Sequence, residues 1–175
     1  MALTRHIFLI GFMGVGKSTV AGELQTKLSV PEIDTDAWIV AQEGMTIPEM
    51  FAQKGEDYFR TRETEFLEKL ASREPCIVSC GGGMAMRPEN VRLMHSQGEV
   101  VYLQAEPETI FEHVRHSTDR PLLNGHMNVE YIAELMGQRQ SKYEAAATMR
   151  VKTDGLTPDA VAQKIIENLE KGLKK

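Results

Sequence analysis

The stretch GFMGVGKSTV, residues 11–20, limits the fold more than any other feature of the sequence, and it directly follows the apolar run IFLI. It satisfies the pattern G-x-x-x-x-G-K-[S/T], with its glycines at Gly11 and Gly16 and its lysine at Lys17. Glycines in such a turn let backbone N–H groups point together, and the next helix adds its positive dipole end. A glycine turn with a surface lysine is the plain alternative. Because a strand pattern precedes the turn and an amphipathic helical pattern follows it, we predict that it binds nucleotide phosphates.

Short apolar runs alternate along the chain with longer segments of helical period. Helix starts are marked by a capping box at Thr46 and Glu49 and by prolines at Pro88 and Pro158. Such alternation is typical of an α/β fold in which helices cover both faces of a parallel sheet. No linker or repeat divides the sequence, so we expect a single domain over residues 1–175. The expected strands are HIFLIGF, PEIDTD, CIVSCG, EVVYLQ and MRVKT.

Composition and charge exclude several classes of function. The chain has 20 basic and 25 acidic residues, a formal net charge of −5, so it lacks the general positive field that holds nucleic acid. No run approaches the ~20 apolar residues of a membrane span. Cys76 and Cys80 fall in an expected core strand and are interpreted as buried, reduced thiols. The opening residues resemble a weak signal peptide, but cleavage would remove the phosphate-binding stretch, so we expect a cytoplasmic protein.

Two carboxylates and a run of glycines follow the ends of expected strands. Asp34 and Asp36 close the second strand, and their spacing places both side chains on one side of an extended chain. One could face a metal and the other a substrate, whereas an N-cap role is the main alternative for either residue. Gly81, Gly82 and Gly83 follow the third strand. Because ligands of open α/β sheets bind beyond the carboxyl ends of the strands, we expect these groups to meet.

The expected helix DYFRTRETEFLEKL, residues 57–70, carries a carboxylate inside its apolar face. At about 100° per residue, Glu63 lies near the centre of that face, where a carboxylate needs a partner. Arg60 lies at the edge of the face, whereas Arg62 points toward Glu65 and the outer surface. Arg60 is therefore the better candidate for a site residue, and an ordinary exposed salt bridge is the alternative. The apolar face consists of Phe59, Phe66, Leu67 and Leu70.

An arginine occupies the apolar face of another expected helix, which runs from Asn128 to about Ala147. Arg139 lies within the stripe, and a guanidinium on a core face is rarely left unpaired. It either pairs inside the protein or receives an anionic ligand, because its forked donors match a carboxylate. The stripe consists of Ile132, Leu135, Met136, Tyr143 and Ala146.

The segment between these helices carries weaker signals. Arg120 precedes a proline, and an Asn-Gly pair makes residues 122–128 the best candidate for a mobile loop over a bound nucleotide. His113 and His116 share a helix face, but no third metal ligand accompanies them. We interpret both histidines as solvated surface residues.

With these residues assembled, the chain resembles shikimate kinase, a P-loop kinase, over essentially its whole length. The similarity covers GFMGVGKST, DTD, GEDYFRTRE, CGGG, RPLL and QRQSKY, in the order and spacing of that family. The resemblance implies a three-layer fold whose five-stranded parallel sheet has the order 2-3-1-4-5. It also implies a substrate-binding region at residues 33–62 and a lid at residues 113–128. One departure is Val40, where the family often has an acidic residue.

The resemblance further implies a role for each matching residue. Lys17, Asp36 and Arg120 would act in catalysis, and Ser18 and Asp34 would hold Mg²⁺. ATP would be bound by Gly14, Val15, Gly16, Lys17, Ser18, Thr19 and Arg120. Shikimate would be bound by Asp36, Arg60, Gly81, Gly82, Gly83 and Arg139. Residues 153–158 fall where the family closes around adenine, so we predict backbone contacts there.

The expected reaction transfers the γ-phosphoryl group of MgATP to the 3-hydroxyl of shikimate. The expected partners are ATP and shikimate, with no nucleic acid and no membrane, and the expected state is a monomer. One rival function is that of another small-molecule or nucleotide kinase, such as a gluconate or nucleoside-monophosphate kinase. Another is a regulatory module that binds nucleotide without transferring phosphate. The two arginines distinguish a shikimate kinase from the first rival. The regulatory module would be expected to have lost one of the catalytic residues, and this chain has all of Lys17, Ser18, Asp34, Asp36 and Arg120.

Overall fold

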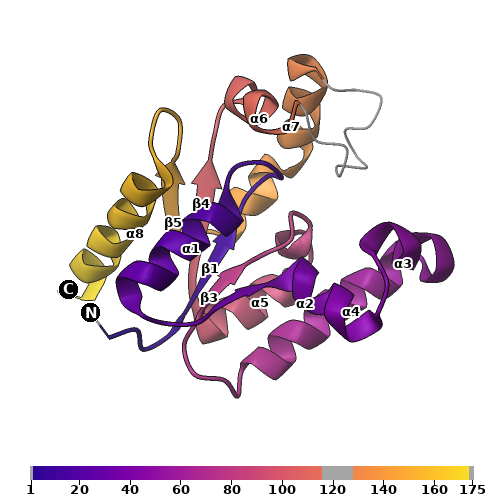
Figure 1. Ribbon diagram of the computed structural model, residues 1–175, viewed down its shortest axis with the longest axis horizontal. Coiled ribbons are helices and arrows are strands. Elements are labelled where there is room, and N and C mark those ends of the chain that lie inside the picture. The colour runs from indigo at the N-terminus through magenta and orange to yellow at the C-terminus, as the bar shows by residue number, and fades with distance from the viewer. Residues whose placement is uncertain (1, 116–127, 174–175) are drawn as a thin grey trace.

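A computed structural model describes residues 2–115 and 128–173 of the chain, and Figure 1 shows their arrangement around a central sheet. The strands are β1 (His6–Ile10), β2 (Glu32–Asp34), β3 (Ile77–Ser79), β4 (Gly98–Gln104) and β5 (Met149–Lys152). The helices are α1 (Lys17–Leu28), α2 (Thr35–Glu43), α3 (Ile47–Lys54), α4 (Glu56–Leu70), the 3₁₀ helix η1 (Met84–Met86), α5 (Pro88–Gln97), α6 (Pro107–Val114), α7 (Val129–Ala146) and α8 (Pro158–Leu173). Each expected strand is present, although all except the fourth are shorter than the segments expected from the sequence.

The sheet is parallel throughout and has the order β2-β3-β1-β4-β5. Strand β1 is central, with Phe8 aligned to Val78 of β3 and Val100 of β4. The expected sheet and its strand order are therefore confirmed. Because all strands run the same way, their carboxyl ends lie at one edge, and the segments after β1, β2 and β3 begin there.

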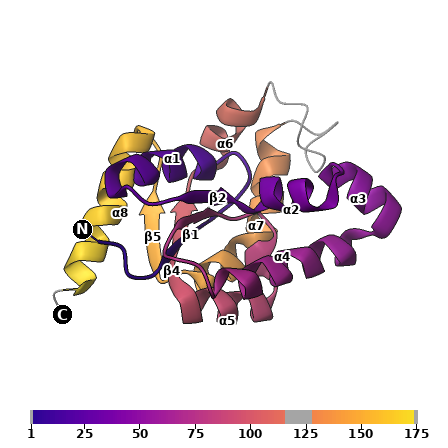
Figure 2. The same cartoon turned by 60° about the horizontal axis from the view of Figure 1, so that its bottom comes forward.

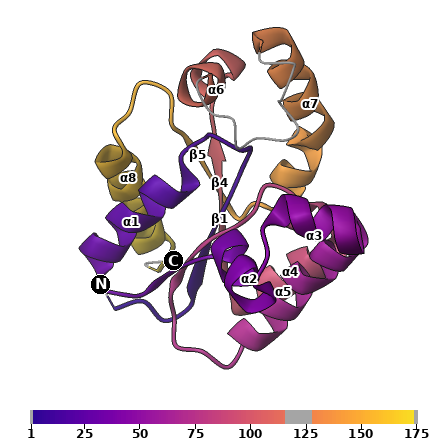
Figure 3. The same ribbon diagram turned by 45° about the vertical axis from the view of Figure 1, so that its right-hand side comes forward.

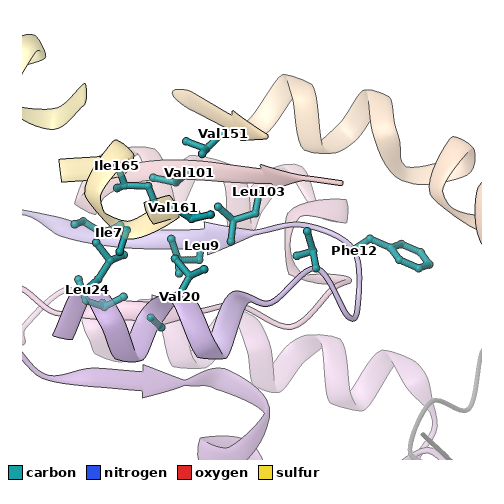
Figure 4. Close-up of a cluster of buried hydrophobic side chains, with 14 of the residues drawn as sticks. Ile7, Leu9, Phe12, Val20, Leu24, Val101, Leu103, Val151, Val161 and Ile165 are labelled. Atoms are coloured by element: carbon teal, nitrogen blue, oxygen red, sulfur yellow. The ribbon is translucent and has the colours of Figure 1, made fainter. Parts of the chain in front are cut away.

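Alternate residues of the central strands face opposite sides of the sheet. Ile7 and Leu9 of β1 pack into one core with α1 and α8, whereas Phe8 and Ile10 pack into a second core with α4, α5 and α7. Figure 4 shows Leu9 between β1 and α1, with the side chains of α8 beside it. Burial on both faces explains why these strands read as continuous apolar runs rather than as alternating patterns.

Helices α2, α3 and α4 form a lobe that extends from the sheet beside β2 (Figure 2). Ile39, Met50 and Phe59 make a small core of their own there. The predicted capping box opens α3, since Thr46 accepts from the Glu49 amide and the Glu49 carboxylate accepts from the Thr46 amide. The chain turns between α2 and α3 and again between α3 and α4. Helix α4 then packs against the sheet through the second core, and its Arg60 and Glu63 lie beside the glycines that follow β3.

Helices α6 and α7 contact each other beyond the carboxyl end of β4 (Figure 3). Helix α7 also packs into the second core together with α4 and α5. None of the helices in residues 2–115 and 128–173 has the length and apolar character needed to cross a membrane.

The two cysteines lie on the same face of the sheet, in the second core, and both are buried free thiols. Burial raises the pKa of Cys76 to about 11 and raises the pKa of Cys80 beyond it. The prediction of buried, reduced thiols is confirmed.

Candidate active site

The phosphate loop, residues 11–18, requires glycine at two positions for different reasons. A Cβ on Gly11 would lie 2.7 Å from the Leu103 carbonyl oxygen, so only glycine allows the loop to pass this close to β4. Gly14 has φ of +77°, and a Cβ there would lie 2.3 Å from Val114 Cγ1 of α6. The glycine pattern in the sequence therefore reflects close contacts with other elements as well as the turn itself.

Helix α1 begins at Lys17, directly after the loop, with its positive dipole end unopposed. Gly16 is the N-cap, it provides no side-chain capping bond, and no acidic residue occupies the first turn. No capping side chain therefore accepts from the first N–H groups of α1. Free N–H groups at the start of a helix are the arrangement that binds anions. Lys17 Nζ donates to the Gly11 and Phe12 carbonyls at 2.8 and 3.1 Å, so its ammonium group lies over the loop.

Ser18 and Asp34 meet as predicted, and Asp34 also has the N-cap role that we held as the alternative. Ser18 Oγ donates to Asp34 Oδ2 at 3.0 Å and lies 3.3 Å from Ser79 Oγ. The other carboxylate oxygen of Asp34 accepts from the Ala37 amide at 2.9 Å and caps α2. One carboxylate therefore holds the start of α2 and presents its second oxygen to the phosphate loop.

These oxygens fit Mg²⁺, which prefers hard oxygen ligands and keeps several of its waters. Within residues 2–115 and 128–173, no group of three or more His, Cys, Asp or Glu side chains could hold a metal ion. A metal here would thus take the Ser18 hydroxyl and the Asp34 carboxylate together with oxygens of nucleotide and water.

The glycine loop, which comprises Gly81, Gly82 and Gly83 after β3, lies against the predicted substrate-binding residues. A Cβ on Gly81 would lie 2.6 Å from Asp36 Oδ1 and 3.2 Å from Glu63 Oε1. A Cβ on Gly83 would overlap the Arg60 guanidinium, with Nη1 at 2.2 Å. The Gly81 amide donates to the Thr35 hydroxyl at 2.9 Å, which ties this loop to the start of α2. Three consecutive glycines let charged side chains from two helices contact one stretch of backbone.

On α4, Arg60 lies between two glutamates. Its Nη1 is 2.9 Å from Glu63 Oε2, and its Nη2 is 3.1 Å from Glu56 Oε1. Glu63 is 0% exposed, so the alternative of an ordinary exposed salt bridge is wrong for this pair. Burial raises the pKa of Glu63 to about 7 against the opposing effect of Arg60, and the Asp36 carboxylate raises it further. Arg62 instead pairs with Glu65, as predicted, and with Glu43 at 2.8 Å.

Arg139 of α7 differs from Arg60 in its partners. It forms no salt bridge with any residue that the structure describes, and it lies near enough to the hydroxyl of Tyr143, one turn later, to oppose the rise that burial causes in that group's pKa. A Cβ on Gly82 would lie 3.3 Å from Arg139 Nη1. The guanidinium therefore lies beside the glycine loop, as Arg60 does, and carries a positive charge without a carboxylate from the described residues.

One cavity of about 1260 Å³ joins these groups. Lys17, Ser18, Asp36, Arg60 and Arg139 all line it, and we call the part at the phosphate loop its nucleotide end and the part at Asp36, Arg60 and Arg139 its acceptor end. Sequence reasoning placed these residues at one edge of the sheet, and the structure brings them together around one hollow. The wall also includes Gly14, Val15, Gly16, Thr19, Asp34, Glu56, Glu63, Gly81, Gly82 and Gly83.

Some residues of the cavity were missed or fall outside the described chain. His113 lies on the exposed surface of α6, as predicted, but its Nδ1 is 2.7 Å from the Gly14 carbonyl and it lines the cavity. No local sequence signal marks this contact, because it depends on how α6 packs. Glu56 could have been found from its four-residue spacing to Arg60. Arg120, His116 and residues 122–127 lie outside the described residues.

The segment predicted to approach adenine also reaches the cavity. Thr153, Gly155, Leu156 and Pro158 line the cavity wall. Arg115 pairs with Glu112 at 3.1 Å on α6. The location of residues 153–158 thus agrees with the prediction, and their contact with adenine stays a prediction.

The parallel sheet, the phosphate loop and the cavity that it lines together with Asp36, Arg60 and Arg139 are typical of a P-loop kinase. The family model for shikimate kinase matches residues 13–170. Shikimate kinase from Geobacter metallireducens is 42% identical over 166 residues, which make up 95% of this chain and 92% of that protein. Shikimate kinase from Deinococcus radiodurans is 39% identical over 163 residues, which make up 93% and 82% of the two chains.

The structure resembles that of shikimate kinase from Acinetobacter baumannii in complex with shikimate. The TM-score is 0.91 at 32% sequence identity, and the match covers 98% of this chain and 96% of that chain. The chain belongs to the shikimate kinase family. The resemblance drawn from its motifs is confirmed, and the protein is an ATP-dependent kinase.

Proposed function

We propose that this chain binds ATP at the phosphate loop and transfers the γ-phosphoryl group to the 3-hydroxyl of shikimate bound at the glycine loop. The observation that carries the proposal is the single cavity with a phosphate-binding helix start at one end and two arginines at the other. Phosphoryl transfer through a loose transition state needs mainly positioning and charge compensation, which such a cavity supplies.

At the nucleotide end, the amides of residues 14–19 bind the phosphates. In the structure, the ammonium of Lys17 donates to the Gly11 and Phe12 carbonyls. When ATP binds, a charged phosphate oxygen replaces these carbonyls as its acceptor. Mg²⁺, held by Ser18 and Asp34, supplies positive charge for the phosphate oxygens. Arg120 is predicted to add charge from the lid and lies outside the described residues.

At the acceptor end, Arg139 beside Gly82 and Arg60 beside Gly83 bind the shikimate carboxylate. Arg139 has no carboxylate partner among the described residues, so it is the primary contact. Arg60 already holds Glu56 and Glu63, so its donors are shared with the ligand. Shikimate carries one carboxylate, whereas a nucleoside monophosphate carries a phosphate and a much larger base. Two arginines against one loop therefore favour a compact carboxylate.

Asp36 orients the acceptor hydroxyl. Its carboxylate lies against Gly81, in the same cavity as Lys17, and accepts hydrogen bonds from the ring hydroxyls of shikimate. A loose transition state requires little deprotonation in advance, so orientation of the nucleophile is its larger role and acceptance of the proton a later one.

An acceptor panel tests this function. ADP release is measured with shikimate, gluconate, AMP and CMP in turn, each with MgATP. We expect turnover with shikimate alone. Turnover with gluconate or a nucleoside monophosphate in place of shikimate would replace the proposal by the first rival function. ATP binding without ADP release for any acceptor would favour a regulatory nucleotide-binding module. The monomeric state and the cytoplasmic location expected from the sequence stay predictions.

A further inference from the structure

Tyr143 contacts both the glycine loop and Arg139 through its hydroxyl group. The residue is on α7, four positions after Arg139, so the two side chains lie on the same face of the helix. Its hydroxyl donates to the Gly82 carbonyl at 2.5 Å. The Arg139 guanidinium acts on the same hydroxyl and opposes the rise that burial causes in its pKa. A guanidinium can only donate and the single phenol hydrogen goes to Gly82, so the lone pairs of the phenol oxygen are left for Arg139.

The ring that carries this hydroxyl is fixed by the core. Tyr143 is 1% exposed and stacks on Tyr102 of β4, with ring centroids 5.2 Å apart and an interplanar angle of 29°. Both rings belong to the second core, against the face of the sheet that includes Phe8 and Ile10. The position of the hydroxyl is therefore determined by packing against the sheet and not by the ligand.

The glycine loop fits closely around this hydroxyl. A Cβ on Gly82 would lie 3.7 Å from the Tyr143 hydroxyl and 3.3 Å from Arg139 Nη1. Gly82, Arg139 and Tyr143 thus form one contact group. Burial raises the pKa of the Tyr143 phenol, so the group remains a donor to Gly82 across the neutral range.

We propose that Tyr143 is a positioning residue of the acceptor site, whose hydroxyl fixes the Arg139 guanidinium and the Gly82 peptide relative to each other before the acceptor binds. The inference rests on the proposed role of Arg139 in holding the shikimate carboxylate. Its function is carried by the hydroxyl, whereas the ring serves the core. A long arginine side chain loses rotational freedom on binding a ligand, and a partner that already holds it reduces that loss.

The variant Tyr143→Phe tests this role, because it keeps the ring and removes only the hydroxyl. We expect KM for shikimate to rise roughly tenfold, the size of a lost hydrogen bond to a charged group. KM for ATP should stay within about twofold and kcat within about threefold, because the phosphate loop is untouched. Calorimetry with shikimate alone should show the same loss of affinity. An unchanged shikimate KM in Tyr143→Phe would overturn the proposal.

Tyr102→Phe is the matched control. It makes the same chemical change on the stacked partner, whose ring contacts Tyr143 and which is 6% exposed. We expect wild-type KM values for both substrates in this variant. A comparable rise of the shikimate KM in Tyr102→Phe would show that the core as a whole determines affinity, and would contradict a specific role for the Tyr143 hydroxyl.

A double-mutant cycle separates this proposal from the proposed function. If Tyr143 acts through Arg139, adding Tyr143→Phe to Arg139→Ala should change the shikimate KM by less than about twofold further. A second tenfold loss would mean that the hydroxyl acts independently of Arg139, which overturns the positioning role and leaves the function intact. A wild-type KM in Arg139→Ala itself would instead remove the assigned carboxylate contact, and the positioning role with it.

Discussion

The two ends of the cavity are built in different ways. The phosphate-binding part of the nucleotide end comes from one continuous stretch, residues 11–19, in which glycine geometry and the start of α1 shape the site and Lys17 contributes charge. The acceptor end is assembled from α2, α4, α7 and the glycine loop, and side chains supply nearly all of its chemistry. Because the first end depends on backbone and the second on side chains, the first is common to proteins that bind nucleotide phosphates and the second selects the acceptor.

A second difference concerns charge balance. At the acceptor end, Arg60 is paired with two glutamates while Arg139 is not paired with any acidic residue that the structure describes. Arg60 and Glu63 form a buried pair within α4, beside the glycine loop, so Arg60 compensates a buried carboxylate and has a structural role that Arg139 lacks. Substitutions at the two ends, and at the two arginines, should therefore differ in kind as well as in size.

The largest effect is expected at the nucleotide end, for Lys17→Ala. Loss of the ammonium removes a positioned charge at the transferring phosphate, so kcat should fall by at least about 100-fold. Steady-state kinetics with saturating shikimate measures it. Lys27→Ala is the matched control, since Lys27 lies on the same helix and pairs with Asp159 at 2.7 Å, and it should keep near-normal turnover. Turnover within tenfold of the wild type in folded Lys17→Ala would contradict the assignment.

The next largest effect is expected for the two arginines. Arg60→Ala and Arg139→Ala should each raise the shikimate KM by about tenfold or more, with KM for ATP little changed. Arg60→Ala should also lower the free energy of unfolding by about 2 kcal/mol, because Glu63 stays buried without its partner. Calorimetry and urea unfolding measure the two effects.

The arginine prediction has its own control in Arg62→Ala. Arg62 is on the same helix as Arg60 but pairs with Glu43 and Glu65, and it does not line the cavity. Its loss should leave the shikimate KM unchanged. Equal losses of stability in Arg60→Ala and Arg139→Ala would remove the distinction drawn between the two arginines.

A smaller effect, visible only as a function of pH, is expected for Glu63. Its pKa is about 7 in the folded protein and ordinarily 4.5, so the folded state holds the proton more tightly. Unfolding then releases a proton between these two values, and stability falls as pH rises through that window. Relative to Glu63→Gln, the wild type should lose about 3 kcal/mol of unfolding free energy between pH 4 and pH 8. Parallel stability curves for the two proteins would show that Glu63 titrates normally.

Much of this site could be predicted from the sequence because its signals are local. The phosphate loop is a contiguous pattern, and Arg60 and Arg139 stand out as charges on apolar helix faces. The glycine loop was found from its position after a strand. The contacts that were missed join distant segments: His113 reaches Gly14, and the Tyr143 hydroxyl reaches Gly82. Such contacts depend on how α6 and α7 pack, and no spacing along the chain encodes that packing.

The central claim is that one hollow receives both substrates, and a crystal structure with shikimate and an unreactive ATP analogue tests it most directly. The account predicts phosphates on the amides of residues 14–19, the shikimate carboxylate between Arg139 and Arg60, and the 3-hydroxyl beside Asp36 facing the γ-phosphate. Shikimate bound outside the cavity, or bound there with its carboxylate away from both arginines, would contradict it.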